Sequence, residues 1–204
     1  MKEETNVKQD INMEERLLDA ARKLLKEGGY ARLTIRRVCM EADCSTSTFY
    51  QYFDSKDDLL ASFIQRNSFK KSSQDDYLNF THPEAIIEIY LQTARYLSSL
   101  PSDVLHNYLT PGNLALNART ISQTKGNGWV MDLVWEHFRK AQSESMFLPG
   151  HDYMDIYSEM DVILFGYLFH WAVYAGEYDL IPPMRKMMIE RLNIYLMPEH
   201  RLSL

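Results

Sequence analysis

The segment Ser45–Phe53, which reads STSTFYQYF, constrains the fold more than any other part of this chain. It follows a short amphipathic run that ends at Ala42, and it carries no formal charge. On a helix, hydroxyl side chains would crowd the first turn, whereas Phe49 and Phe53, four residues apart, would share one face. Such a helix can be anchored by its phenylalanines while its N-terminal turn touches a polar surface. A helix-turn-helix uses its recognition helix in this way in the major groove of DNA.

The remaining sequence predicts an all-α fold, because it has no alternating strand pattern and no hairpin turn of the Asn-Gly type. We expect helices from after Asn12 to Gly28-Gly29, over 34–42, over 45–53, from Ser55 without a break to His82-Pro83, and over 83–99, 101–109, 127–146, 152–176 and 182–197. The stretch 111–126 fits neither helix nor loop cleanly. Thr34 and Ser45 are expected N-caps. Ser55 with Asp58 and Thr81 with Glu84 have the spacing of capping boxes.

Charge and the positions of Gly and Pro divide the chain into an expected domain over 1–56, which holds the suspected helix-turn-helix, and a larger helical domain over 57–204. The first part holds ten basic and ten acidic residues and the second holds 12 and 18, so the net charge of −6 belongs to the second part. The neutral first part keeps Arg32, Arg36, Arg37 and Lys56 near the suspected recognition helix. A local basic cluster of this kind can meet phosphates.

Several classes of protein are disfavoured by the composition. Two cysteines make no disulfide framework and the N-terminus has no apolar signal core, so we expect a cytoplasmic protein. The uncharged run Val162–Gly176 is shorter than the roughly 20 apolar residues that span a bilayer. We expect no enzyme and no cofactor, because no nucleophile–base pair and no phosphate-cradling glycine loop is evident. The histidines show no spacing that would predict a metal site.

The order and spacing of motifs over Thr34–Leu60, TIRRVCMEADCSTSTFYQYFDSKDDLL, resemble the TetR family of one-component transcriptional regulators. That family has a Thr-led second helix, an Ala-Gly-Val-Ser-like turn, a Thr-Leu-Tyr-x-x-Phe recognition helix and a Ser-Lys-x-x-Leu start to the fourth helix. Asp43 replaces the usual turn glycine, but aspartate can also adopt the left-handed conformation. Ser47 and Gln51 replace the family's common Gly or Ala and His, which affects the operator sequence.

The resemblance and the side-chain chemistry together predict the DNA contacts. Tyr50 and Lys56 are expected to bind phosphate, as are Thr34 and one or both of Arg36 and Arg37. Thr46, Ser47 and Gln51 are the candidates for base edges, since Gln can pair with adenine and hydroxyls are permissive. Tyr52 is either a core residue or a phosphate contact. The full expected set is Thr34, Arg36, Arg37, Ser45, Thr46, Ser47, Thr48, Tyr50, Gln51, Tyr52 and Lys56.

Cys39 and Cys44 stand where the family has Ala and Val. We expect them to fill apolar sites, with a redox switch as the alternative.

By position, the helices over 152–176 and 182–197 resemble the pair through which this family forms homodimers. A two-fold dimer would place its recognition helices about 34–36 Å apart on a palindromic operator. The expected ligand pocket lies among aromatic residues of the second domain: Tyr90, Tyr96, Tyr108, Trp129, Trp135, Phe138, Tyr157, Phe165, Phe169 and Trp171.

These features predict a repressor that a small, largely apolar or aromatic effector releases from double-stranded DNA. An activator, or a protein-responsive regulator without a small-molecule pocket, is the alternative. An open apolar cavity in the body would favour the ligand-gated repressor, and a fully packed body would favour the alternative.

Overall fold

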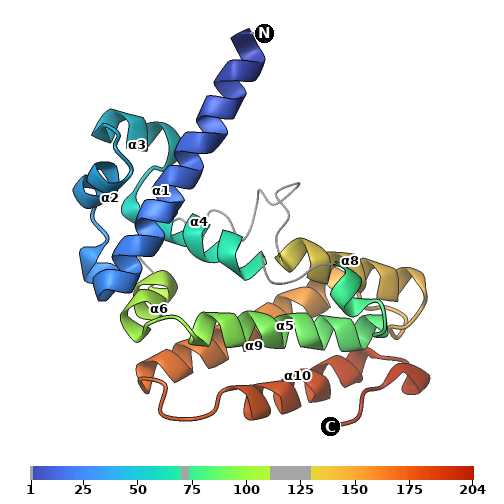
Figure 1. Ribbon diagram of the computed structural model, residues 1–204. Coiled ribbons are helices and arrows are strands. Elements are labelled where there is room, and N and C mark those ends of the chain that lie inside the picture. Colours follow the sequence, from blue (N-terminus) through green and yellow to red (C-terminus); the bar gives the residue numbers. More distant parts are fainter. Residues whose placement is uncertain (1, 70–73, 111–129) are drawn as a thin grey trace. The chain divides into compact units, whose positions relative to one another are not determined.

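The computed structural model describes residues 2–69, 74–110 and 130–204 (Figure 1). The chain forms two compact units, Met1–Arg66 with Asp103–Gln123, and Asn67–Ser102 with Thr124–Leu204. Over the described residues every regular element is helical, apart from an isolated antiparallel bridge between Phe147 and Leu196. The predicted all-α fold is therefore confirmed.

The first unit is built from short helices packed around a long one (Figure 1). Its elements are α1 (Lys2–Arg32), α2 (Ile35–Glu41), α3 (Thr46–Tyr52), α4 (Lys56–Phe69) as far as Arg66, and α6 (Ser102–Leu109) from Asp103 onward. α2 packs against both α1 and α3. Leu17, Val38, Phe49 and Leu59 are fully buried, so each of the first four helices contributes to the core. Burying apolar side chains from every element fixes the short helices that could not persist alone.

The N-terminus of α1 differs from the sequence prediction. The expectation that this helix begins after Asn12 is wrong, because α1 is helical from Lys2. No Gly or Pro interrupts the preceding sequence. The predicted break at Gly28-Gly29 is confirmed, since both have non-helical backbone angles and Gly29 has a φ of 65°.

The C-terminus of α4 also differs. The prediction of one unbroken helix to Pro83 is wrong, because α4 ends at Phe69 and a 3₁₀-helix, η1 (Gln74–Tyr77), precedes α5. Asp75 and Asp76 lie within η1, and aspartate side chains compete with helical hydrogen bonds by bonding to nearby backbone groups.

The second unit is centred on α5. Its elements are η1, α5 (His82–Ser98), α8 (Val130–Ser143), α9 (Tyr153–Val173), α10 (Ile181–Tyr195) and η2 (Pro198–His200). α5 packs against α8, α9 and α10, and α9 also packs against α8 and α10. Tyr90, Phe138, Leu168 and Met188 are fully buried in this unit.

The predicted positions of α5, α6, α9 and α10 agree with the structure to within three residues. The start of the helix expected over 127–146 lies outside the described residues. The capping box of Thr81 and Glu84 is present at the start of α5. Among the described helices, none is long and apolar enough to cross a membrane.

Candidate nucleic-acid interface

The turn between α2 and α3 is a Schellman motif. The Asp43 N–H donates to the Met40 carbonyl at 3.4 Å, and the Cys44 N–H donates to the Cys39 carbonyl at 3.0 Å. Asp43 has a φ of 49°, the left-handed conformation that this motif requires at the residue after the helix cap. Asp43 thus takes the role that glycine has in the resembled motif.

Ser45 caps the N-terminus of α3. Its Oγ accepts from the Thr48 N–H at 3.0 Å and lies 2.7 Å and 2.8 Å from the hydroxyl oxygens of Ser47 and Thr48. A hydroxyl that satisfies a free N–H group of the first turn stabilises the start of the helix. The hydroxyl network therefore holds Ser45 and Thr48 in structural roles before any DNA is bound.

The two faces of α3 have different roles. Phe49 and Phe53 are buried, with ring centroids 5.8 Å apart, and they anchor the helix in the core of the first unit. The opposite face exposes Thr46, Ser47, Tyr50 and Gln51, which the helical period places within about 140° of arc. Tyr50 is 54% exposed. This outward face, defined by those four side chains, is the candidate reading surface. Tyr52 is half-buried.

The start of α2 provides a second candidate contact. Thr34 caps the helix by accepting the Arg37 N–H at 3.3 Å, and its side chain is exposed. Arg36 and Arg37 are both exposed, and in the part of the chain that the structure describes neither forms an ion pair. Their guanidinium groups are therefore available to an external anion such as a phosphate.

Lys56, the first residue of α4, is held against an aromatic ring. Its Nζ lies 4.0 Å from the centroid of the Tyr30 ring, a cation–π contact, and the Tyr30 hydroxyl donates to the Asp57 carboxylate. Burial, followed by the hydrogen bond and charge of Asp57, raises the pKa of Tyr30. The phenol therefore stays protonated and keeps its donor. The Tyr30 ring thus holds the ammonium group of Lys56 in place, and the Lys56 side chain is half-buried.

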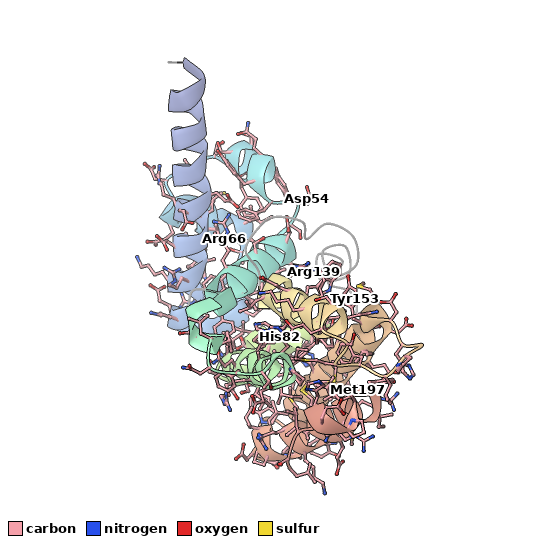
Figure 2. All side chains as sticks on the ribbon, turned by 90° about the vertical axis from the view of Figure 1, so that its right-hand side faces the viewer. Asp54, Arg66, His82, Arg139, Tyr153 and Met197 are labelled. Carbon is pink, nitrogen blue, oxygen red and sulfur yellow. The ribbon has the colours of Figure 1, made fainter. Side chains whose placement is uncertain are left out.

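Two local contacts fix the start of α4. The Ser55 hydroxyl accepts the Asp58 N–H at 3.0 Å, which confirms Ser55 as the predicted cap. The Asp58 carboxylate reaches back to the N–H of Asp54, labelled in Figure 2, at 2.9 Å. This bond lies one residue earlier than in a standard capping box. Further along α4, Arg66 (Figure 2) pairs with Glu14 at 2.6 Å and Glu15 at 2.9 Å on α1.

Sequence reasoning did not identify Tyr30 or Asp103 as parts of this region. The Tyr30 N–H donates to the Asp103 carboxylate at 2.7 Å, so the first turn of α6 supplies a partner for the backbone just after Gly29. A Cβ on Gly29 would lie 2.2 Å from that carboxylate. The Gly28-Gly29 pair signalled only the end of a helix, and no local pattern reveals a partner 73 residues away.

The expected ligand-pocket residues divide into three groups. Tyr90 and Phe138 are buried in the second unit, and Tyr108 is buried on α6 of the first unit. Tyr96, Tyr157, Phe165 and Trp171 are half-buried, while Trp135 and Phe169 are 38% and 52% exposed. Trp129 lies outside the described residues.

Some of these aromatic residues surround a carboxyl group. The Tyr90 hydroxyl donates to the Asp161 carboxylate at 2.9 Å, and Tyr157 also hydrogen-bonds to it. Burial raises the pKa of Asp161 to about 6, although both tyrosine hydroxyls act in the opposite direction. The Tyr157 ring makes edge contacts with Trp135 and Phe138, with centroids 5.9 Å and 6.0 Å away. We call Tyr90, Tyr157 and Asp161 the carboxyl cluster.

α9 and α10 leave an apolar surface. Val162, Phe169 and Val173 on α9 and Met187 and Ile194 on α10 are all more than 40% exposed. A hollow of about 640 Å³ beside them is lined by Ile163, Gly166, Tyr167, His170, Tyr178 and Pro183. None of the expected pocket residues lines this hollow. Among the described residues, no group of three or more potential metal ligands occurs.

The recognition helix of this helix-turn-helix is anchored in the core by buried phenylalanines, and it presents a polar face to solvent. The exposed side chains of Arg36 and Arg37 flank that face. This arrangement is that of a DNA-binding transcriptional regulator. Residues 17–63 match the sequence profile described as "Bacterial regulatory proteins, tetR family". Residues 17–63 therefore form a TetR-type DNA-binding domain.

Comparison with individual proteins agrees with this assignment. The HTH-type transcriptional regulator HbdR of Aromatoleum sp. (strain CIB) is 24% identical over 159 residues, 76% of this chain and 69% of its own. The HTH-type transcriptional repressor KstR of Rhodococcus jostii (strain RHA1) is 43% identical, but over only 51 residues, 25% of this chain and 24% of that protein. These relatives are regulators of transcription.

Among solved structures, FadR of Thermus thermophilus, a TetR-family transcriptional repressor crystallised with lauroyl-CoA, superposes with a TM-score of 0.62. The alignment covers 93% of this chain and 98% of that one at 19% identity. At this identity the likeness shows a shared fold.

Proposed function

We propose that this protein is a cytoplasmic repressor that binds a palindromic operator as a homodimer and is released by a small, largely apolar ligand. The observation that carries the proposal is the exposed face of α3, whose polar side chains are held by a buried aromatic anchor. A rigid helix with outward polar groups can enter the major groove without reorganising.

Base recognition is assigned to Thr46, Ser47 and Gln51. All three are exposed, and among the described residues the side chains of Thr46 and Gln51 have no hydrogen-bond partner. Gln51 can pair with an adenine edge, while the hydroxyls are permissive. The uncharged reading surface leaves most of the affinity to the phosphate contacts around it.

Phosphate binding is assigned to Tyr50, Lys56, Thr34 and the two arginines at the start of α2. The Tyr30 ring holds Lys56 beside the start of α4, where the helix dipole also favours an anion. Arg36 and Arg37 have no acidic partner that would compete with phosphate among the described residues. Glu41, the acidic residue on α2, is already neutralised by Lys23 at 2.6 Å.

Dimerisation is assigned to the exposed apolar surface of α9 and α10. Val162, Phe169 and Val173 follow a helical period along one face of α9, and a face of this kind in water favours burial. Exposed Gly166 lies on the same side and would let a partner helix approach closely. A two-fold axis through this surface would present two reading surfaces to a palindrome.

The binding site for the effector is assigned to the second unit. The aromatic rings around the carboxyl cluster offer apolar contacts, and the likeness to the lauroyl-CoA-bound repressor makes a fatty acyl thioester the first ligand to test. A ligand that binds a different conformation of the dimer more tightly would lower the affinity for operator by linkage.

The proposal is tested with the full-length chain. DNA fragments bound from a random double-stranded pool are sequenced, and a palindromic consensus is expected. Release of a labelled consensus duplex is then followed by fluorescence anisotropy with lauroyl-CoA, using coenzyme A without an acyl chain as the control. Release by lauroyl-CoA alone supports the acyl ligand, whereas indifference to both compounds contradicts it. Absence of any preferred sequence would contradict the repressor itself.

Substitutions separate base contacts from phosphate contacts. Tyr50→Phe and Lys56→Ala should weaken binding to all sequences alike, and Lys56→Ala should reduce the salt dependence by about one counterion. Gln51→Ala should instead change the consensus. A uniform loss of affinity in Gln51→Ala would contradict the assignment of Gln51 to a base edge.

A further inference from the structure

The two cysteines of this chain occupy paired positions in the helix-turn-helix. Cys39 and Cys44 are the third-from-last helical residue and the second residue beyond the cap in the Schellman motif, and they are joined by the 3.0 Å backbone hydrogen bond. In this motif the side chains at these two positions commonly touch. With ordinary bond lengths, that hydrogen bond keeps their Cα atoms within about 7 Å of each other. Disulfides usually join Cα atoms about 4.4–6.8 Å apart.

The thiols also contact each other and the recognition helix. Cys39 is hydrogen-bonded to the Cys44 thiol, and its Sγ lies 3.7 Å from the carbonyl oxygen of Ser45, the cap of α3. Cys39 is buried, whereas Cys44 is half-buried and open to a small reagent. The sequence contains only these two cysteines, so neither has another partner within the chain.

We propose that Cys39 and Cys44 form a reversible disulfide across the helix-turn-helix, and that this modification switches off operator binding. The inference rests on the proposed function, because it concerns the same reading surface. A disulfide brings its sulfur atoms to about 2.05 Å, closer than two thiols in contact. The bond therefore pulls on the residues that position the first turn of α3.

The chemistry requires a hydroperoxide as the oxidant. The Cys44 thiolate attacks one peroxide oxygen, the O–O bond breaks, and a sulfenic acid and one water form. The Cys39 sulfur then attacks the sulfenic sulfur. The S–S bond forms, the S–OH bond breaks, and the Cys39 proton leaves with the hydroxide as a second water. Two thiols and one hydrogen peroxide thus give one disulfide and two waters, and an external dithiol reverses the change.

The surroundings of the Cys44 thiol determine how fast the disulfide forms, and not whether it forms. Burial, followed by the neighbouring Cys39, raises the pKa of the Cys44 thiol, while Arg16 on α1 acts in the opposite direction and Asp43 adds to the rise. Because the thiolate is the reacting form, oxidation should be slow at neutral pH and should accelerate as the pH rises. The pair would therefore respond to sustained peroxide rather than to brief exposure.

The test uses the full-length protein and hydrogen peroxide. Intact mass and free-thiol titration are expected to show the loss of two hydrogens and of both thiols, with no covalent dimer. On the selected duplex, the oxidised protein should bind at least about tenfold more weakly, the scale of one lost base contact. Dithiothreitol should restore binding.

The matched controls are Cys39→Ala and Cys44→Val, which place the residues of the resembled motif at these positions. Each variant should bind the duplex like the reduced protein and keep its affinity in peroxide. Persistence of two free thiols after prolonged oxidation would overturn the disulfide, and an oxidised protein that binds as tightly as the reduced one would overturn the switch. Failure of the reduced protein to bind any DNA would contradict the proposed function instead, and the mass measurement would still decide whether the disulfide forms.

Discussion

The half-buried Asp161 should make the second unit less stable as the pH rises. Its folded pKa of about 6 lies above the value of about 3.9 for an unfolded aspartate, so the folded state holds the proton more tightly. A raised folded pKa gives stability that is complete below pH 3.9 and is lost as the pH rises through 6. Integrating the two titrations gives a loss of about 1.4 kcal/mol between pH 5 and pH 8.

Asp161→Asn removes this titration while leaving an oxygen that can accept from the Tyr90 hydroxyl. The free energy of unfolding of the variant, relative to that of the unaltered protein, should therefore rise by about 1.4 kcal/mol between pH 5 and pH 8. Urea unfolding followed by tryptophan fluorescence measures this, since Trp135 and Trp171 both lie in the second unit. Comparing the two proteins at each pH cancels the other titrating groups.

Glu159→Gln is the matched control on the same helix. Hydrogen bonds from Arg191 and Tyr195 lower the pKa of Glu159, so this carboxylate is ionised in the folded state throughout that pH range. The difference in free energy of unfolding between Glu159→Gln and the unaltered protein should stay nearly constant between pH 5 and pH 8. If the difference for Asp161→Asn is also constant, or grows toward acid, the argument that burial controls the Asp161 pKa is refuted.

Three further predictions concern a turn, a cap and a histidine. Gly29→Ala should lower the thermal unfolding midpoint far more than Gly150→Ala, because both have positive φ but only the Gly29 Cβ would strike another group. Ser45→Ala should cost about 1 kcal/mol in urea unfolding followed by far-UV circular dichroism; an equal effect of Thr46→Ala would argue against the cap. Burial, then His82, lowers the pKa of His137 to about 4, so stability is lost as the pH falls below 6.5. His137→Asn should therefore gain about 2 kcal/mol on the unaltered protein from pH 8 to pH 5, and a pH-independent difference would contradict this.

Much of the first unit could be predicted because its determinants are local. Thr34, Ser45 and Ser55 cap helices within three residues of their partners, and the spacing of Phe49 and Phe53 identifies the buried face of α3. Such signals depend on sequence neighbours alone. The order of the helices in the helix-turn-helix and the buried face of α3 could therefore be predicted from the sequence.

Contacts between distant residues in the second unit could not be predicted from the sequence alone. Asp161 reads as one more surface carboxylate of an acidic segment, yet Tyr90 contacts it from 71 residues away. The 3₁₀-helix η1 is not predicted either, because no Pro or Gly separates it from α4 in the sequence. The Asp161 contact depends on tertiary packing, which no local pattern encodes.

The Asp103–Tyr30 bond has a consequence for anyone who would transplant this regulator's specificity onto another effector domain. A fusion cut after α4 would keep every side chain assigned to DNA, yet it would lose the α6 carboxylate that binds the Tyr30 N–H. The ring of that same tyrosine holds Lys56. A working chimera therefore has to carry the first turn of α6 along with the N-terminal helices, as two separate pieces of sequence that travel together.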